Sequence, residues 1–345
     1  MNEPSTNTEV RDTLGRPIGD LRISVSDRCN LRCSYCMPRE IFGDSYEFLK
    51  NSELLSFDDI VRIATAFVEL GVRKIRITGG EPLLRKDLPS LIARLNALEG
   101  LEDLALTTNG VLLIEYAQAL RDAGLHRITV SLDSMDAKVI ETMNGQYLDP
   151  RKVLAGIDAA TAAGFESIKI NTVVQRGIND HTLVDLAREF RNTPHILRFI
   201  EYMDVGNRNG WKLDDVVSAK EILEMLQQEF PLKPLEKTYR SEVASRYGYE
   251  DGAGEIGFIS SVTNTFCEDC NRARISADGQ LYTCLFSGNG IDLKSQLSSN
   301  QDSGQLLTFL SDIWTRRDDR YSELRASMTD FEQHQQKVEM YQIGG

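Results

Sequence analysis

The sequence predicts an α/β protein with a parallel sheet, because strand-like and helix-like segments alternate six times between residues 21 and 202. Residues 57–68 carry apolar side chains at helical spacing, whereas short apolar segments such as 73–78 have the length of buried strands. Consecutive parallel strands need a crossover connection, usually a helix, so the alternation favours parallel pairing. A doubly wound sheet and a partial barrel both satisfy this pattern.

The βα units follow one another without a long interruption. The first strand, 21–26, leads into a cysteine-rich loop and an irregular excursion, 39–55. Ser56 with Asp59 three residues later resembles a capping box and predicts a helix start. The remaining predicted strands are 73–78, 101–107, 127–132, 167–173 and 196–202, and the predicted helices are 57–68, 88–98, 111–122, 151–163 and 180–191. Loops that carry function should leave the carboxyl ends of these strands.

The pattern changes after about residue 212. Ser218 and Glu221 predict a second capping box and a short helix that extends to Phe230. Beyond it we expect a polar, Gly-rich stretch, a strand, an exposed loop and an amphipathic segment, over residues 231–255, 255–260, 287–304 and 305–316. We therefore expect three parts: a flexible N-terminus (1–16), a barrel or sheet (17–215) and a smaller C-terminal domain (216–345).

Composition excludes several classes of protein. The 345 residues carry a formal net charge of −13 and a pI of about 4.9, which argues against general affinity for nucleic acid or an anionic membrane. The first thirty residues lack the apolar run of a signal peptide, and no window approaches a membrane span. We expect a soluble, cytoplasmic protein.

All six cysteines fall into two triplets, and the first follows strand 21–26 directly with the spacing C-x3-C-x2-C; the triplets are Cys29, Cys33 and Cys36, and Cys267, Cys270 and Cys284. Thiolates bind iron–sulfur clusters and soft metals. Disulfides suit short secreted chains better, and structural zinc normally takes four ligands, for which the four scattered histidines provide no spacing. Clusters are favoured, and each would have one iron without a cysteine ligand.

The first triplet, with Tyr35 before its last cysteine, resembles the cluster loop of the radical S-adenosylmethionine (SAM) enzymes. The turn Gly79-Gly80-Glu81-Pro82 follows the second strand, as it does in that superfamily. The resemblance implies that the open iron binds the methionine part of SAM. It also implies that reductive cleavage yields a 5′-deoxyadenosyl radical.

The second triplet narrows the resemblance. Residues 266–274, with Asp278-Gly279 and Cys284-Leu285, resemble the C-terminal cluster segment of the GTP 3′,8-cyclases, which carry out the first step of molybdenum cofactor biosynthesis. Other segments that match this family are Gly15-Arg16-Pro17, Cys36-Met37-Pro38, Thr107–Gly110, Ser131–Asp133 and Gly344-Gly345. The resemblance covers the chain from about residue 12 to its end and weakens in residues 233–254 and 287–304.

This resemblance implies a fold, two cofactors and a reaction. The fold is a partial (β/α)6 TIM-type barrel, the radical SAM core, with a smaller C-terminal α+β domain that carries the second cluster. The cofactors are SAM and two [4Fe-4S] clusters, one on each cysteine triplet. The reaction converts GTP to (8S)-3′,8-cyclo-7,8-dihydroguanosine 5′-triphosphate, after the adenosyl radical abstracts the ribose C3′ hydrogen.

It also implies which residues contact the small molecules. The expected SAM contacts are Tyr35, Gly80, Ser131 and Met203, and the expected GTP contacts are Arg22, Arg76, Thr107, Lys169, Arg272, Ala273 and Arg274. Guanidinium forks suit phosphate oxygens, and two arginines two apart on an extended segment point the same way. The open iron of the second cluster would bind the guanine base. The tail residues Gly344 and Gly345 would thread into a crowded active site, where a side chain would clash.

The implied partners are GTP, a reduced electron donor of the flavodoxin or ferredoxin type, and cyclic pyranopterin monophosphate synthase as the downstream enzyme. Nucleic acid and membranes are not expected as partners, and a homodimer is left open. Two alternatives stand beside this interpretation. One is a radical SAM maturase that acts on a peptide, against which Arg22 and residues 272–274 favour a nucleotide. The other is a non-catalytic iron–sulfur or zinc-binding module.

Overall fold

A computed structural model describes residues 9–239, 241–298, 303–328 and 336–344 of the chain. Its strands form one twelve-stranded sheet in the order β12-β11-β10-β1-β2-β3-β4-β5-β6-β9-β8-β7. The strands are β1 (Asp20–Ser24), β2 (Lys74–Thr78), β3 (Asp103–Thr108), β4 (Arg127–Ser131), β5 (Lys169–Val174), β6 (Ile196–Glu201), β7 (Leu232–Leu235), β8 (Ser245–Tyr249), β9 (Glu255–Ile259), β10 (Arg272–Ile275), β11 (Gln280–Tyr282) and β12 (Ile291–Asp292).

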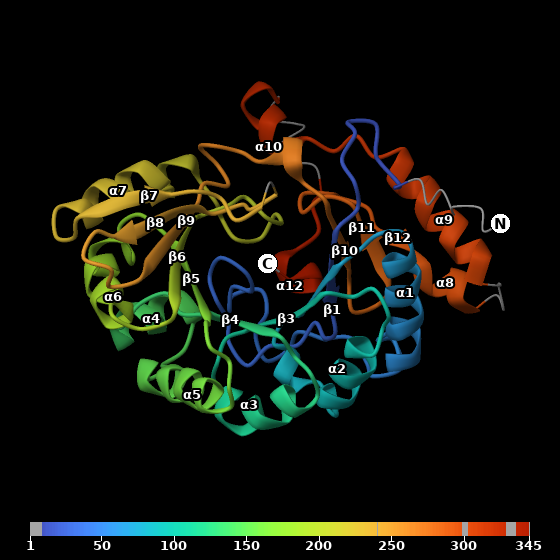
Figure 1. The fold of residues 1–345 in the computed structure, drawn as a ribbon, viewed down its shortest axis with the longest axis horizontal. Coiled ribbons are helices and arrows are strands. Elements are labelled where there is room, and N and C mark those ends of the chain that lie inside the picture. Colours follow the sequence, from blue (N-terminus) through green and yellow to red (C-terminus); the bar gives the residue numbers. More distant parts are fainter. Residues whose placement is uncertain (1–8, 240, 299–302, 329–335, 345) are drawn as a thin grey trace, which may run out of the picture.

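Strands β1 to β6 are parallel and curve into an open ring, with the crossover helices on its outer side (Figure 1). The helices are α1 (Phe57–Glu69), α2 (Leu88–Asn96), α3 (Leu113–Asp122), α4 (Ala137–Asn144), α5 (Pro150–Ala162), α6 (Leu183–Phe190), α7 (Ala219–Gln227), α8 (Leu293–Ser298), α9 (Ser303–Thr315), α10 (Tyr321–Leu324) and α12 (Met340–Ile343). The predicted partial (β/α)6 barrel is therefore confirmed.

The C-terminal part extends the same sheet at both of its edges. Strand β10 pairs in parallel with β1, and β9 pairs in parallel with β6. Antiparallel strands then follow outward on each side, β11 and β12 beyond β10, and β8 and β7 beyond β9. One sheet thus runs across both parts of the chain, and the division at residue 215 stays a prediction.

Both predicted capping boxes are present. The Ser56 side chain accepts a hydrogen bond from the backbone N–H of Asp59 at the start of α1, and Ser218 does the same with Glu221 at the start of α7. Each box satisfies N–H groups that have no partner within the first turn of a helix. Helix α1 then buries Ile60, Ile63 and Phe67 against the sheet.

Three expectations about local structure need correction. Residues 137–144 form α4, which the alternation of strands and helices in the sequence does not predict. The helix is only eight residues long, and Asp136 caps its start. The polar stretch 231–255 contains β7 and β8: β8 pairs with β9 and β7 pairs with β8, and this pairing outweighs their low apolar content. The expected loop 287–304 contains β12 and α8, where Leu293 and Leu297 are buried in the core.

The expected flexible N-terminus, residues 1–16, is revised where the structure describes it. Residues 1–8 lie outside the described residues. Asp12 and Arg16 are buried, and the Arg16 guanidinium bonds to the Asp12 carboxylate. Two buried, paired charges fix this segment against the rest of the protein, so the prediction does not extend to them.

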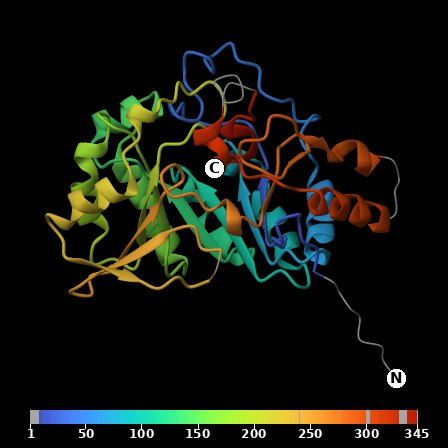
Figure 2. The same cartoon turned by 90° about the horizontal axis from the view of Figure 1, so that it is seen from above.

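The C-terminal segment enters the barrel. Figure 1 shows helix α12 within the outline of the ring of strands, and Figure 2 shows it toward one end of the ring, on the same side as the blue loop that follows β1. The Tyr341 hydroxyl lies 2.8 Å from the Tyr46 hydroxyl of the loop that follows the first cysteine triplet. Within the parts of the chain that the structure describes, no helix has both the length and the apolar character needed to cross a membrane.

Candidate functional site: a basic cavity beside the second cysteine triplet

A cavity of about 500 Å³ lies inside the barrel, between the inward-facing side chains of β1 to β6 and the segment that carries the second cysteine triplet. Its wall includes nine basic and three acidic side chains of the described residues. The basic ones are Arg22, Arg73, Lys74, Arg76, Arg127, Lys169, Arg198, Arg272 and Arg274. An acidic protein thus gathers positive charge at one place, which suits a polyanionic ligand.

Strand register produces this concentration of charge. Arg22 on β1 is the pairing partner of both Arg76 on β2 and Arg274 on β10, so three arginines lie side by side across three strands. Two residues earlier on the same strands, Asp20 pairs with Lys74 and Arg272 and makes a second row. Residues two apart on a strand point to the same face, so both rows face the cavity.

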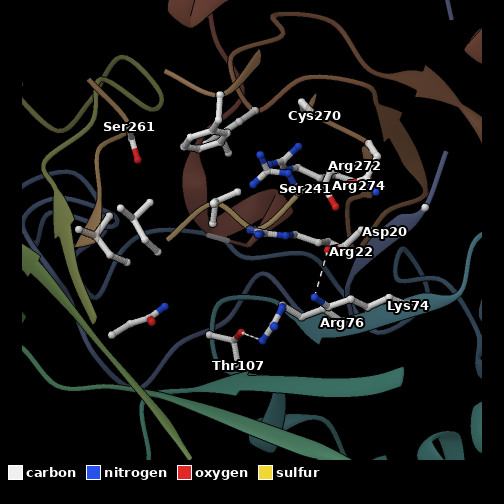
Figure 3. A pocket seen from close by; sticks show the side chains of 18 of the residues that line it. Asp20, Arg22, Lys74, Arg76, Thr107, Ser241, Ser261, Cys270, Arg272 and Arg274 are labelled. Carbon is white, nitrogen blue, oxygen red and sulfur yellow. Dashed lines mark hydrogen bonds and ion pairs between the residues drawn. The ribbon is translucent and has the colours of Figure 1, made fainter. Parts of the chain in front are cut away.

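The arginines of the first row are incompletely neutralised. Burial, Arg274 and Arg272 together lower the pKa of Arg22 well below its ordinary value. Burial and Arg272 lower the pKa of Arg274 to about 10. The buried Nε atoms of Arg22 and Arg274, and Nη1 of Arg274, have no hydrogen-bond partner among the described residues. These donors are available to a bound anion (Figure 3).

Two lysines also line the cavity, Lys169 on β5 and Lys74 on β2. Burial, followed by the charges of Arg198 and Arg127, lowers the pKa of Lys169 to about 7. Burial lowers the pKa of Lys74 to about 8, although Asp20 opposes that shift. The ligand-free cavity therefore penalises protonated lysines, and an anion there would relieve the penalty.

Thr107 lies in the cavity wall but also serves its neighbour. The Arg76 guanidinium donates to the hydroxyls of Thr107 and Thr129, at 3.0 and 3.1 Å. Figure 3 shows Thr107 and Arg76 joined in this way on the side of the cavity opposite Cys270. The two hydroxyls fix the direction in which Arg76 presents its remaining donors.

The second cysteine triplet lines the same cavity: its members are Cys267, Cys270 and Cys284. Although burial raises the pKa of Cys270, the guanidiniums of Arg272, Arg317 and Arg274 lower it to about 6. All six cysteines of the chain are free thiols in the structure. Three thiols on one wall, with a cationic environment that favours a thiolate, form a donor set that fits an iron–sulfur cluster.

The first triplet lies elsewhere, on the loop after β1 and outside the cavity wall. Burial and the charges of Cys29 and Cys36 raise the pKa of the Cys33 thiol. Among the described residues, no three His, Cys, Asp or Glu side chains are arranged to hold a single metal ion. Tetrahedral zinc would hold its sulfurs within ~4 Å of one another.

Two features attach this loop to the barrel. The Tyr35 hydroxyl donates to the Asp133 carboxylate at 2.8 Å, which connects the loop to the end of β4. The Gly80 N–H donates to the Ser26 carbonyl at 2.7 Å, and a Cβ on Gly80 would lie 2.4 Å from the Arg28 carbonyl oxygen. Only glycine lets the second motif pack this closely on the first.

Glu81 completes the connection between neighbouring loops. Its carboxylate accepts from the backbone N–H groups of Leu83 and Asn109 and from the Thr108 hydroxyl, at 2.8 to 3.0 Å. Burial raises the pKa of Glu81 to about 7, against the effect of these bonds. The sequence singles out Glu81 as part of a turn, and the structure gives its side chain a role in holding two loops.

The remaining predicted site residues divide into groups. Of the four expected SAM contacts, Met203 lines the cavity, whereas Tyr35, Gly80 and Ser131 lie outside its wall. Ala273 is fully buried in the core, because its side chain faces away from the side that Arg272 and Arg274 share. Gly344 packs on Thr78 at the end of β2, and Gly345 lies outside the described residues.

The prediction missed several cavity residues: Lys74, Arg127, Arg198 and Tyr239. A signal exists for Lys74, which precedes Arg76 by two positions on a strand and so must share its face. The Arg198 guanidinium bonds to the Asn171 side chain at 2.7 Å, and Asn171 also lines the cavity. Strand register brings Arg127 and Arg198 to the predicted residues, and Tyr239 comes from the connection between β7 and β8.

Comparison with known proteins agrees with this architecture. Residues 23–190 match the radical SAM superfamily, and residues 195–323 match the family described as Molybdenum Cofactor Synthesis C. A solved structure of methylornithine synthase (PylB) superposes with a TM-score of 0.51 over 91% of this chain and 86% of its own, at 14% sequence identity. At that identity the likeness concerns the fold alone.

Curated relatives are much more similar in sequence. A GTP 3′,8-cyclase of Acidothermus cellulolyticus is 55% identical over 93% of this chain and 90% of its own length. The GTP 3′,8-cyclase of Xanthomonas axonopodis pv. citri is 52% identical over 97% and 99%. That of Staphylococcus saprophyticus is 49% identical over 98% and 99%.

Proposed function

The chain belongs to the GTP 3′,8-cyclase family of radical SAM enzymes, and from that membership we propose that its basic cavity is the GTP site. The reaction of the family is the cyclisation of GTP to 3′,8-cyclo-7,8-dihydro-GTP, the first step of molybdenum cofactor biosynthesis. Its cofactors are SAM and [4Fe-4S] clusters. The assignments of individual residues below are our proposals.

One observation carries the assignment of the cavity. The row Arg274, Arg22 and Arg76 places three guanidiniums on adjacent strands, next to the second cysteine triplet, with buried donor atoms that no described residue satisfies. A buried donor without a partner costs about 1–3 kcal/mol, so a ligand with several acceptor oxygens is the natural complement. A triphosphate combines several acceptor oxygens with negative charge, whereas a peptide backbone offers carbonyl acceptors without that charge.

We assign the first cluster to Cys29, Cys33 and Cys36, and the second to Cys267, Cys270 and Cys284. When bound, the first cluster and SAM supply the hydrogen-abstracting radical, and the second cluster supplies an iron site for the guanine base. SAM would contact Tyr35, Gly80, Ser131 and Met203. Met203 is in the cavity wall, so it is the residue of this group that would face both ligands.

The protein's own residues bind and orient the nucleotide. The phosphates would be held by Arg22, Arg76, Lys169, Arg272 and Arg274. Thr107 would orient the Arg76 guanidinium through their hydrogen bond. If the phosphates are held at one end and the base at the other, the ribose lies between them in a fixed position. The reacting groups are then held close together and need not meet by diffusion. Helix α12 and Gly344 fill the barrel near the end of β2 and would exclude water there.

We also propose the wider setting. A reduced flavodoxin or ferredoxin-type protein would deliver the electron, and cyclic pyranopterin monophosphate synthase would take the product. We further propose a cytoplasmic location, consistent with the net charge of −13 and with free cysteines. A homodimer and the division of the chain at residue 215 remain predictions.

Anaerobic incubation of the reconstituted protein with SAM, a strong reductant and GTP tests the proposal. We expect 5′-deoxyadenosine to accumulate in a GTP-dependent way, together with the cyclised nucleotide. Cys29→Ser should abolish cleavage of SAM while the second cluster stays detectable by its spectrum. SAM cleavage that is indifferent to GTP would instead favour the peptide-maturase alternative, and zinc in place of iron would favour a non-catalytic module.

A further inference from the structure

Arg317, just after α9, touches two segments of the second cysteine triplet with one buried guanidinium. Its Nη1 donates to the Cys270 carbonyl at 2.9 Å, and its Nη2 donates to the Cys270 sulfur at 3.4 Å. Its Nε donates to the carbonyl of Thr283, the residue before Cys284, at 3.1 Å. The side chain is only 1% exposed, so water does not compete for these bonds.

A second arginine holds the third segment. Arg16 Nη1 donates to the Cys267 carbonyl at 2.7 Å and to the Asp319 carbonyl at 2.9 Å. The Asp12 carboxylate connects the two arginines, with its Oδ2 2.6 Å from Arg16 Nε and 2.8 Å from Arg317 Nη1. All three cysteine segments are therefore held by one network of two guanidiniums and one carboxylate.

The aromatic ring of Trp314 fixes the position of this network. The Arg317 guanidinium lies 4.6 Å from the centre of the Trp314 ring, and the Trp314 indole N–H donates to the Arg16 carbonyl at 3.1 Å. Trp314 is itself almost fully buried. A lysine in this position would keep the positive charge but would lose the plane and the fork, so it could make only part of these contacts.

The charge balance of the network is uneven. Asp12 is shared by two cations, and Asp319 approaches Arg317 at 3.2 Å with a side chain 27% exposed. A buried positive charge without full compensation is costly unless it faces a negative group. The group that it faces is the Cys270 sulfur. Hydrogen bonds to ligand sulfurs, net charge and solvent exposure are the factors that set the reduction potential of an iron–sulfur cluster.

We propose that Arg317 is a positioning residue of the second cluster, and that its hydrogen bond to Cys270 raises the reduction potential of that cluster. Asp12 acts in the opposite direction, since its carboxylate withdraws part of the positive charge. Arg16 has the positioning part of the role only, because its bonds go to carbonyl oxygens rather than to sulfur. This inference rests on the proposed iron–sulfur cluster at Cys267, Cys270 and Cys284.

The test uses the full-length protein, reconstituted with iron and sulfide, in a Cys29→Ser background so that the second cluster is observed alone. A redox titration monitored by electron paramagnetic resonance gives its potential, and iron analysis gives its occupancy. We expect Arg317→Gln to shift the potential downward and Arg317→Lys to shift it less. We expect Asp12→Asn to shift it upward. A residue that merely supports the loop would not produce shifts of opposite sign.

Arg316→Gln is the matched control, because Arg316 adjoins Arg317 but its side chain is 83% exposed. The reduction potential of the second cluster in Arg316→Gln should equal that in the parent protein. If Arg317→Gln loads no cluster while Arg317→Lys does, the positioning role is supported, and the potential is then read from Arg317→Lys and Asp12→Asn. Unchanged potentials in these variants would overturn the inference. A parent protein without iron would overturn the proposed function itself.

Discussion

At the scale of single residues, the cavity depends on cations that the fold holds close together against their mutual repulsion. Arg274 is the member of the first row whose buried donors are least satisfied, since both its Nε and its Nη1 have no partner among the described residues. A bound anion would therefore supply the hydrogen-bond acceptors that these donors of Arg274 lack in the ligand-free protein. Arg22, on the neighbouring strand, shares this condition in part, because its buried Nε has no partner among the described residues.

Arg274→Ala should weaken GTP binding without removing either cluster. Loss of a charge-assisted hydrogen bond to phosphate costs about 1.5–3 kcal/mol, which corresponds to roughly 10–150-fold in the dissociation constant. Anaerobic equilibrium dialysis with GTP measures the affinity, and iron analysis verifies the clusters. Arg94→Ala, on the outer helix α2, is the control and should bind like the parent. Equal affinity of Arg274→Ala and the parent would contradict the proposed contact.

Lys169 makes GTP binding depend on pH. Its pKa is about 7 in the ligand-free protein, chiefly through burial, and a bound triphosphate would raise it. Above pH 7 the free protein has lost that proton, so binding must take one up, and the affinity should fall from pH 7 to pH 9. Titration calorimetry in buffers of different ionisation enthalpy measures the proton uptake. Lys169→Met should bind more weakly at pH 7 and show a smaller dependence.

The lowered pKa of Lys169 also predicts how the stability of the protein depends on pH. The pKa of Lys169 is lowered in the folded protein, so the unfolded chain binds more protons above pH 7. The penalty of burying Lys169 is therefore greatest below pH 7 and shrinks as the pH rises toward the ordinary value for lysine. Lys169→Met should raise the melting temperature of the ligand-free protein more at pH 6 than at pH 9.5. The reverse order would contradict the shift.

Single residues also show what the sequence could and could not predict. The cysteine triplets and Arg272 with Arg274 are recognisable because their spacing is local. Arg198 and Arg127 are not, since a basic residue on a strand gives no sign of facing inward. Asp12 and Arg317 are 305 residues apart along the chain, and only the folded structure brings them together.

At the scale of elements, Glu201 at the end of β6 connects three pieces of structure. Its buried carboxylate accepts from the N–H of Ala219 at the start of α7. It also accepts from the N–H groups of Val262 and Thr263 in the turn after β9. That turn leads toward Cys267, so an acidic side chain on the barrel sets where the second triplet begins. Nothing in the sequence marks Glu201, because it ends an ordinary strand.

Glu201→Ala should destabilise the protein by about 3 kcal/mol, because several buried N–H donors lose their acceptor at once. Chemical denaturation of the anaerobic protein measures the change. Glu224→Ala on the exposed side of α7 is the comparison, since its ion pair with Lys220 lies in solvent, and it should stay within about 0.5 kcal/mol. Similar losses in both variants would show that Glu201 has no special role.

Helix and strand boundaries were predictable where local chemistry defines them. The boxes at Ser56 and Ser218 specify helix starts by themselves. Four short strands were not predictable: β7, β8, β11 and β12. Each has two to five residues and forms by pairing with a strand that already belongs to the sheet. Helix α8 was missed because its flanking residues have the composition of a loop.

At the scale of the whole molecule, the chain closes on itself. Strand β10 pairs with β1, and α12 also packs near β1. Elements from the last third of the sequence therefore complete the sheet that β1 begins. The sequence resemblance correctly implied a barrel followed by a smaller C-terminal part, and the cluster on that part stays a prediction. It did not imply that both share one sheet, because strand pairing across some 250 residues leaves no pattern in a single sequence.

Gly344→Ala should dislodge the tail. Gly344 has a φ of +64°, and a Cβ on it would lie 2.1 Å from the Thr78 hydroxyl oxygen. We expect the C-terminal residues to become sensitive to carboxypeptidase, with a loss of GTP-dependent turnover. Gly210→Ala is the control, because Gly210 has a φ of +65° but open space around it. An equal effect in both variants would assign the result to backbone strain rather than to contact with Thr78.

The pairing of β1 with β10 has a consequence for how the protein is made. Arg22 leaves the ribosome about 250 residues before its partner Arg274, and at ~5–20 residues per second that interval is roughly 10–50 seconds. During this time β1 has an unpaired edge and one apolar face, to which Leu21 and Ile23 belong. The cavity cannot form before β10 has been synthesised, so cofactor loading at the second triplet must follow the synthesis of β10 and of Cys284. Because slower elongation lengthens this interval, slow synthesis leaves that first strand unpaired for longest.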